Sequence, residues 1–264
     1  MKQIFTIKRT VSVLMCVALA LLLTGCSEAL RAKANKKVLI YTKNGKGGSG
    51  YVHKNIPASI VGLKEICQKN GWACEATDDA SIFTTEKIAE FDVLVFSNTN
   101  NETFDTESQK KVFQEYIRAG GGFVAIHSAC ASERKWPWYW ANVGCKFVSH
   151  PPFQKFDVKV IDNNHLSTEF LPDIWKWEDE CYLFDHLSLK MNVLLAADLR
   201  TITFNNPKGH PGKTFGDYVP VCWYQEFEGG RQWYTALGHA PEHFKDANYI
   251  KHLEGGIRWA MRKK

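Results

Sequence analysis

The feature that most limits the fold is the alternation of short apolar runs with amphipathic helical patterns in the first half of the chain. Four strands are expected, at Lys37–Tyr41, Trp72–Thr77, Phe91–Phe96 and Phe123–Ile126. Helical spacing of apolar residues predicts two helices between them, from Ile56 to Asn70 and from Thr106 to Ala119. Strands that are apolar throughout and alternate with helices form βαβ units. We therefore expect an α/β fold with an open, mainly parallel sheet and helices on both faces.

The second half is less regular. Further strands are expected at Lys155–Ile161, Val193–Ala197, Val219–Phe227 and Arg231–Leu237. The last two flank Glu228-Gly229-Gly230, which predicts a hairpin. Short and long helices are expected at Trp136–Ala141 and Asp246–Met261. The chain shows no internal repeat, so we expect one domain with an elaborated second half.

The N-terminus has the pattern of an export signal. Basic residues precede an apolar run, Val11–Leu23, that is too short to span a bilayer comfortably. Leu23-Thr24-Gly25-Cys26 resembles the lipobox of bacterial lipoproteins. We expect residues 1–25 to be a signal peptide, residues 26–36 the lipidated Cys26 and its tether, and residues 37–264 the folded domain. The protein would then lie in the cell envelope, held to a membrane through Cys26; the alternative is an uncleaved anchor helix.

Charge and cysteine content exclude some functions. The net charge of +5 is modest, and no basic cluster with interleaved aromatic residues suggests a nucleic-acid partner. The chain has no CxxC spacing, so neither a zinc ribbon nor a thioredoxin-like redox motif is expected. Six cysteines follow Cys26; export would allow some to oxidise, but most are expected to be small buried apolar residues.

Polar residues follow three of the predicted strands. Tyr51 and His53 come after the first, Asn98 after the third, and His127 and Ser128 after the fourth. Ligands of open α/β sheets bind at the carboxyl ends of the strands. These residues are therefore expected to converge on one rim and to contact a substrate.

His127 stands in the most informative context. GGGFVAIHSA places it between small residues directly after a buried strand, as in the strand-turn-helix elbow that displays a nucleophile in α/β enzymes. An imidazole titrates near neutral pH and suits a base, an acid or a metal ligand. A purely structural histidine at a strand end is the alternative.

The chain resembles the ThuA-like (trehalose utilisation) family. The resemblance rests on GYVHKNIP, GGGFVAIHSA, GCKFVSHPP, DNNHLSTEFLP, DECYLF and PVCWYQEFEGGRQWYTALGHAPEHF, in this order over residues 37–262. It implies a flavodoxin-like sheet related to class I glutamine amidotransferases, and a role in sugar catabolism. Those enzymes carry a catalytic Cys at the elbow, whereas this chain has His127. Glutamine hydrolysis by that mechanism is therefore excluded.

Other residues of these motifs complete a candidate site. His150 lies in a proline-rich loop, His239 follows an apolar strand, and Glu180 lies beside aromatic residues that would raise the pKa of a carboxyl group. Trp223 is a candidate face for a sugar ring. We expect catalysis by His127, Glu180 and His239, and substrate binding by Tyr51, His53, Asn98, Ser128, His150 and Trp223. His53, His127, His150 and His239 are candidate ligands of a divalent metal such as Zn²⁺.

The expected function is a hydrolase or lyase that acts on a disaccharide or its 3-keto derivative by His/Glu acid–base chemistry. One alternative is a surface lipoprotein that binds sugars without catalysis, which needs aromatic residues and hydrogen-bond donors but no convergent titratable groups. The other is a metal-dependent hydrolase of a different small substrate.

Overall fold

The structure, a computed structural model, describes residues 36–45, 51–206, 211–212 and 214–261. The expected signal peptide, Cys26 and all of the tether except Lys36 lie outside the described residues. In the described part, no helix is long and apolar enough to cross a membrane.

One nine-stranded sheet runs through the whole molecule, in the order β2-β1-β3-β4-β11-β10-β9-β6-β7. Its strands are β1 (Lys37–Tyr41), β2 (Ala73–Thr77), β3 (Val93–Ser97), β4 (Gly122–Ile126), β6 (Gln154–Val160), β7 (Ile174–Asp179), β9 (Asn192–Asp198), β10 (Tyr218–Phe227) and β11 (Gly230–Thr235). The first five strands in this order are parallel. The pairs from β11 to β7 are antiparallel. A flavodoxin-like half is thus extended by an antiparallel half.

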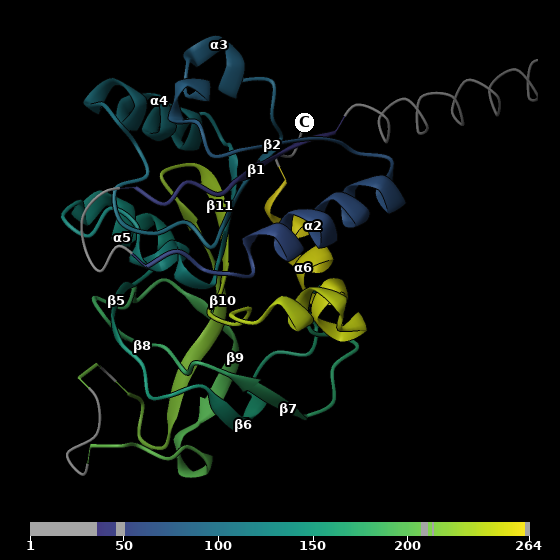
Figure 1. The fold of residues 1–264 in the computed structure, drawn as a ribbon, viewed down its shortest axis with the longest axis vertical. Helices are drawn as coiled ribbons and strands as arrows, with labels where there is room; N and C mark the ends of the chain where they lie inside the picture. The colour runs from purple at the N-terminus through teal and green to yellow at the C-terminus, as the bar shows by residue number, and fades with distance from the viewer. Residues whose placement is uncertain (1–35, 46–50, 207–210, 213, 262–264) are drawn as a thin grey trace, which may run out of the picture.

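Helices cover both faces of the parallel half (Figure 1). One face carries α2 (Ile56–Asn70) and α6 (Ala247–Ala260), and the other carries α3 (Thr85–Ile88), α4 (Glu107–Arg118) and α5 (Pro137–Val143). Short 3-10 helices are η1 (Ala80–Ile82), η2 (His127–Ala131), η3 (Leu199–Thr201) and η4 (Pro241–Lys245). The expected α/β class, with helices on both faces, is confirmed.

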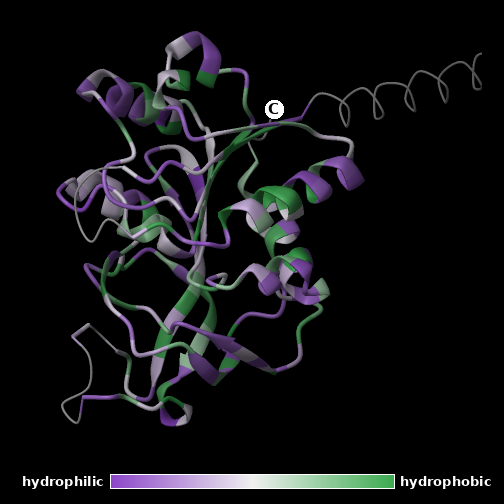
Figure 2. Ribbon diagram, in the orientation of Figure 1, coloured by the Kyte–Doolittle hydropathy of each residue, from purple (hydrophilic) through white to green (hydrophobic). Residues whose placement is uncertain are grey.

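Local sequence signals account for the helix ends. Gly71 ends α2 with a φ of 66°, and its N–H bonds to the carbonyls of the last turn. Thr106 and Gln109 form a capping box at the start of α4. Apolar residues line the central strands and the inner faces of the helices (Figure 2). The six cysteines after Cys26 are all free, and every one except Cys74 is buried.

The second half differs more from the expectation. The β10–β11 hairpin is confirmed, with Gly229 at a φ of 93° in its turn. Three strands were not predicted: β7, and the two-stranded sheet of β5 (Lys146–Ser149) and β8 (Leu183–Asp185). In β7 the buried Trp175 and Trp177 alternate with exposed residues, a period-2 pattern that the acidic residues at the end of the strand obscured.

Candidate functional site

Four chain connections meet at the carboxyl edge of the sheet. His53 lies between β1 and α2, His127 directly after β4, Glu180 directly after β7, and His239 between β11 and η4. Because β11 pairs in parallel with β4, their ends lie at the same edge. The antiparallel pairings from β11 to β7 return β7 to the direction of β11, so its end faces the same way. The predicted rim therefore exists, and the antiparallel half contributes to it.

His127 occupies the elbow. It is the first residue of η2, is completely buried, and has a φ of 52°. Its Nδ1 lies 2.6 Å from the carbonyl oxygen of Ala236, and its Nε2 lies 2.8 Å from the hydroxyl of Tyr182. Since a carbonyl oxygen only accepts hydrogen bonds, Nδ1 carries the proton and donates. Nε2 therefore carries a lone pair, which accepts a hydrogen bond from the hydroxyl of Tyr182.

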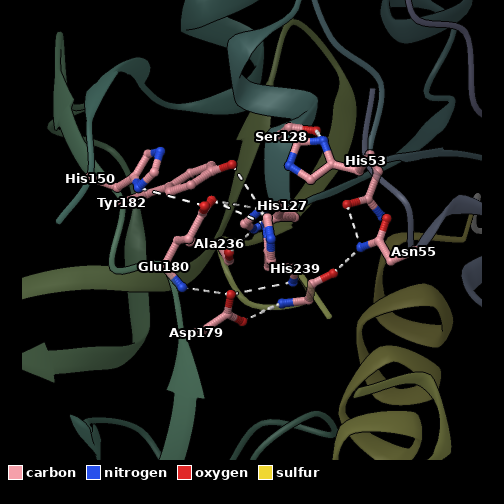
Figure 3. A network of polar contacts seen from close by, with 12 residues as sticks. His53, Asn55, His127, Ser128, His150, Asp179, Glu180, Tyr182, Ala236 and His239 are labelled. Carbon is pink, nitrogen blue, oxygen red and sulfur yellow. Dashed lines mark hydrogen bonds and ion pairs between the residues drawn. The ribbon is translucent and has the colours of Figure 1, made fainter. Parts of the chain in front are cut away.

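Glu180 and three histidines form one cluster around this lone pair (Figure 3). Nitrogen or oxygen atoms of His53, His127, Glu180 and His239 all lie within 4.8 Å of one another. Nε2 of His127 is 3.3 Å from Nδ1 of His239, and that nitrogen is 3.2 Å from Oε2 of Glu180. The third side, from Nε2 of His127 to Oε2 of Glu180, measures 3.6 Å. The three residues expected to be catalytic are thus in mutual contact.

Asp179 holds two members of the cluster in place. Its completely buried carboxylate accepts hydrogen bonds from the backbone N–H groups of Glu180 (2.8 Å), Gly238 (2.7 Å) and His239 (3.3 Å). The indole N–H of Trp177 donates a fourth bond, at 2.9 Å. The carboxylate therefore ties the end of β7 to the loop after β11. In the sequence, the only signal for Asp179 is its position beside Glu180 in the DECYLF motif.

The surroundings of the cluster shift the pKa values of its members in different directions. Burial, reinforced by the neighbouring His127, lowers the pKa of His53 to about 2, so this ring is neutral. Burial alone would lower the pKa of His239, but the hydrogen bond and charge of Glu180 outweigh it and raise that pKa. Burial likewise opposes ionisation of Glu180, but the neighbouring His127 and His239 outweigh it and hold its pKa below the usual range. The expectation that the aromatic surroundings would raise this pKa is therefore wrong.

A pocket of about 240 Å³ opens in front of the cluster. Its walls are Tyr51, His53, Asn100, Ser128, Ala131, Arg134, Phe147, His150, Glu180 and Tyr182. The Ser128 hydroxyl lies 3.2 Å from Nδ1 of His53, and Tyr51 stands half-exposed at the edge. The predicted substrate-binding residues Tyr51, His53, Ser128 and His150 therefore reach the pocket. Asn100, Arg134 and Tyr182 also reach it and were not predicted.

Three expectations need correction. Trp223 is completely buried, donates its indole N–H to the carbonyl of Val143 and packs in the core, so it cannot face a sugar. Asn98 is also completely buried, and its side-chain oxygen accepts a hydrogen bond from Asn55 at 2.9 Å. His150 lies 3.7 Å from Glu180 but stands outside the four-residue cluster. Glu180 takes its place in the candidate ligand set.

Cys130 does not replace the missing elbow thiol. It is buried beneath the turn, where its Sγ contacts the carbonyl of His127 at 3.4 Å and accepts from the hydroxyl of Tyr234 at 3.1 Å. A thiol in this position cannot meet a substrate in the pocket.

A larger open groove, of about 830 Å³, lies beside the site. Phe153, Trp177, Glu178, Glu242 and His243 belong to its walls, and it contains no member of the cluster. The ring of Phe153 is 5.6 Å from that of His239. We assign the chemistry to the smaller pocket because two members of the cluster, His53 and Glu180, line it.

Comparison with known proteins identifies one family and a shared fold. A family model described as "Trehalose utilisation" (ThuA) matches residues 37–260. No functionally curated protein matches the chain. A solved ThuA-like protein from Bacteroides uniformis is 23% identical, with a TM-score of 0.69 over 86% of this chain and 91% of that one. Another, from Parabacteroides merdae, is 18% identical, with a TM-score of 0.63 over 87% and 92%. A β-galactosidase from Bacillus circulans is 11% identical, with a TM-score of 0.53 over 85% of this chain and 31% of that one. These three likenesses show a shared fold.

Proposed function

The chain belongs to the ThuA (trehalose utilisation) family, and from this premise we propose that it is a carbohydrate-active enzyme whose catalytic centre is the cluster of His53, His127, Glu180 and His239. The family points to a sugar-related role. The observation that carries the proposal is the convergence of four titratable side chains, two of which, His53 and Glu180, line a pocket. A site that only binds sugars has no need of such a cluster, because hydroxyl groups can be held by hydrogen-bond donors and acceptors that do not exchange protons with the sugar.

The proposed reaction is elimination from a 3-keto-glycoside. The ketone at C3 acidifies the C–H bond at C2, so a base can remove that proton and form an enolate. The enolate then expels the glycosidic oxygen from C1, and an acid protonates the departing alcohol. Addition of water across the new double bond would complete a net hydrolysis. No oxidant or reductant is needed.

Side chains alone can supply both proton transfers. Nε2 of His127 has the lone pair that a base requires, since Nδ1 is committed to the carbonyl of Ala236. His239 has a raised pKa beside Glu180 and suits the acid. This assignment retains the expected roles of His127 and His239, with Glu180 as the charged partner.

The pocket has polar groups for the sugar hydroxyls. Arg134 donates to Asn100 at 3.3 Å through one guanidinium nitrogen, and its buried Nε has no partner among the described residues. Tyr51 and Phe147 add aromatic surface to the same walls. The neighbouring groove, reached past Phe153, would accommodate the second sugar of a disaccharide.

The test compares trehalose with 3-keto-trehalose and follows release of free glucose. We expect turnover of the keto compound only, because the unoxidised sugar lacks an acidic C–H bond. Glu180→Gln should reduce the rate at least about 100-fold, because it removes the charge that raises the pKa of the acid His239. His186→Asn is the matched control: His186 is exposed and outside the cluster, and Asn tolerates its φ of 52°.

Two results would contradict the proposal. Tight sugar binding without turnover would favour the alternative of a sugar-binding protein without catalysis. Full activity in Glu180→Gln would move the chemistry away from the cluster.

A further inference from the structure

We propose that His53, His127, Glu180 and His239 bind one divalent transition-metal ion, with Zn²⁺ as the reference ion. The proposal rests on the proposed function only for what the ion does there. Binding of the ion is a separate property and can be measured without a substrate.

The spacing of the donor atoms is the first argument. Nε2 of His127, Nδ1 of His239 and Oε2 of Glu180 form a triangle with sides of 3.2, 3.3 and 3.6 Å. Zn–N and Zn–O bonds of about 2.0–2.2 Å at tetrahedral angles place neighbouring ligand atoms about 3.3–3.6 Å apart. The triangle therefore has the size of one face of a tetrahedral coordination shell. His53, with a ring nitrogen inside the same 4.8 Å limit, supplies the fourth ligand.

The hydrogen bonds behind the ligands are the second argument. Metal-bound histidines usually donate their other ring nitrogen to a carbonyl or a hydroxyl, which fixes the tautomer and the direction of the lone pair. His127 donates Nδ1–H to the carbonyl of Ala236, and Nδ1 of His53 lies beside the hydroxyl of Ser128. Both histidines are therefore held by groups behind them and turn their second nitrogen toward the cluster (Figure 3).

The third argument is the rigidity of the ligand-bearing backbone. Asp179 binds the N–H groups of Glu180 and His239 with the same buried carboxylate. Asn55 donates to the carbonyl of Gly238, next to His239, and to Asn98. The ligands thus converge before any ion binds, so little ordering is required on binding.

The ligand types indicate which ion fits. Three imidazoles and one carboxylate suit Zn²⁺ and its first-row neighbours, whereas Mg²⁺ and Ca²⁺ prefer oxygen ligands. On its open side the cluster faces the 240 Å³ pocket, through Glu180 and His53. An ion there would polarise the ketone oxygen of a 3-keto-sugar as a Lewis acid. The proton transfers would then fall to pocket groups outside the ligand set, His150 and Tyr182.

Tyr182 gives a prediction that is specific to metal binding at this cluster. Its hydroxyl lies 2.8 Å from Nε2 of His127 and donates to the lone pair that an ion would need. The hydroxyl proton therefore competes with the ion. Tyr182→Phe removes this competitor and should bind Zn²⁺ at least as tightly as the wild-type protein.

The experiment measures metal binding by the full-length protein directly. The protein is purified, its metal content is determined by mass spectrometry, and it is stripped with a chelator and titrated with Zn²⁺ alone by calorimetry. The variants are His127→Asn, Glu180→Gln, His239→Asn and Tyr182→Phe, with His186→Asn as the control. Co²⁺ replaces Zn²⁺ for visible absorption spectra, whose d–d bands report coordination by the cluster.

We expect about one ion per chain, a loss of Zn²⁺ affinity of at least 100-fold in Glu180→Gln and His239→Asn, and no change in His186→Asn. Thermal unfolding checks that each variant is folded, and the conservative Glu180→Gln keeps the test valid if His127→Asn unfolds. Absence of binding, equal affinity in Glu180→Gln and His239→Asn, or loss of binding in Tyr182→Phe would overturn the four-ligand assignment.

The two proposals fail in different ways. Turnover of 3-keto-trehalose that survives complete metal removal would refute the metal role and leave the side-chain mechanism in place. Stoichiometric Zn²⁺ binding by the cluster without turnover of any keto-sugar would support the metal site and refute the proposed reaction.

Discussion

At the scale of single residues, His127 at the elbow has a strained backbone conformation that serves the site. A non-glycine residue with a φ of 52° costs about 1–2 kcal/mol relative to ordinary backbone. The hydrogen bonds of Nδ1 to Ala236 and of Nε2 to Tyr182 offset that cost. The strained turn directs the imidazole from the end of β4 toward Glu180, which a residue in an extended conformation would not do.

Asp179 is the residue whose role is easiest to test at this scale. Asp179→Asn keeps the size but replaces one acceptor oxygen with an NH₂ group, which would face N–H donors. We expect the free energy of unfolding to fall by about 1–3 kcal/mol, the usual cost of an unsatisfied buried polar group. We also expect weaker Zn²⁺ binding, since Glu180 and His239 lose their common anchor. Urea denaturation and calorimetry measure the two effects.

Glu178→Gln is the matched control, because Glu178 lies on the same strand with its side chain exposed. It should leave both quantities unchanged. If Asp179→Asn behaves like this control, Asp179 does not position the site.

At the scale of secondary-structure elements, the four strands of the first half matched the expectation, and three of them, β1, β3 and β4, are almost entirely buried. In β3 and β4 every residue is buried, and the apolar runs in the sequence report this directly. The strands β5, β7 and β8 are short or half-exposed, and the sequence signal of such strands is weak.

The packing of α6 on the sheet predicts a pH dependence of stability. His252 on this helix is completely buried; its Nδ1 donates to the carbonyl of Ser167, and its Nε2 lies 3.3 Å from the hydroxyl of Thr235. Burial lowers its pKa to about 4. The unfolded chain takes up a proton below its ordinary pKa of 6.5, whereas the folded chain does so only near 4. Stability is therefore fully present above pH 6.5 and is lost as the pH falls toward 4, by about 3 kcal/mol for this group.

His165 has its pKa lowered to about 4 in the same way, so the wild-type slope contains more than one proton. His252→Gln keeps a donor and an acceptor but cannot titrate. We expect the slope of unfolding free energy between pH 4 and 6.5 to decrease by up to one proton, or about 1.4 kcal/mol per pH unit. Urea denaturation across this range measures it, and an unchanged slope would show that His252 does not contribute.

At the scale of the whole molecule, the site belongs to both halves of the sheet. The parallel half supplies His53 and His127, and the antiparallel extension supplies Glu180 with its anchor Asp179. His239 follows β11, the strand that joins the two halves. The elaborated second half is therefore part of the candidate active site.

Attachment to a membrane is also a property of the whole molecule, and we propose it from the N-terminal sequence. Cys26→Ala should abolish incorporation of labelled fatty acid and leave an unprocessed precursor, because the lipid is added to that thiol. Cys16→Ala, which changes a cysteine of the expected signal peptide, should be labelled normally. Labelling that persists in Cys26→Ala would refute the lipoprotein assignment.

The sequence by itself determined the α/β class, the family, the hairpin and the rim that carries His53 and His127, whereas Glu180 and His239 were added to the candidate site from the family motifs. It could do so because strand burial and the order of βαβ units follow from local residue patterns. Only the tertiary structure decided that Trp223 and Asn98 lie in the interior, that Glu180 rather than His150 joins the cluster, and that Asp179, Asn100, Arg134 and Tyr182 serve the site. The reason is physical: these roles depend on side-chain directions and on contacts between residues about 30 to 110 positions apart, such as Tyr182 with His127 and Asp179 with His239, and no local pattern encodes them.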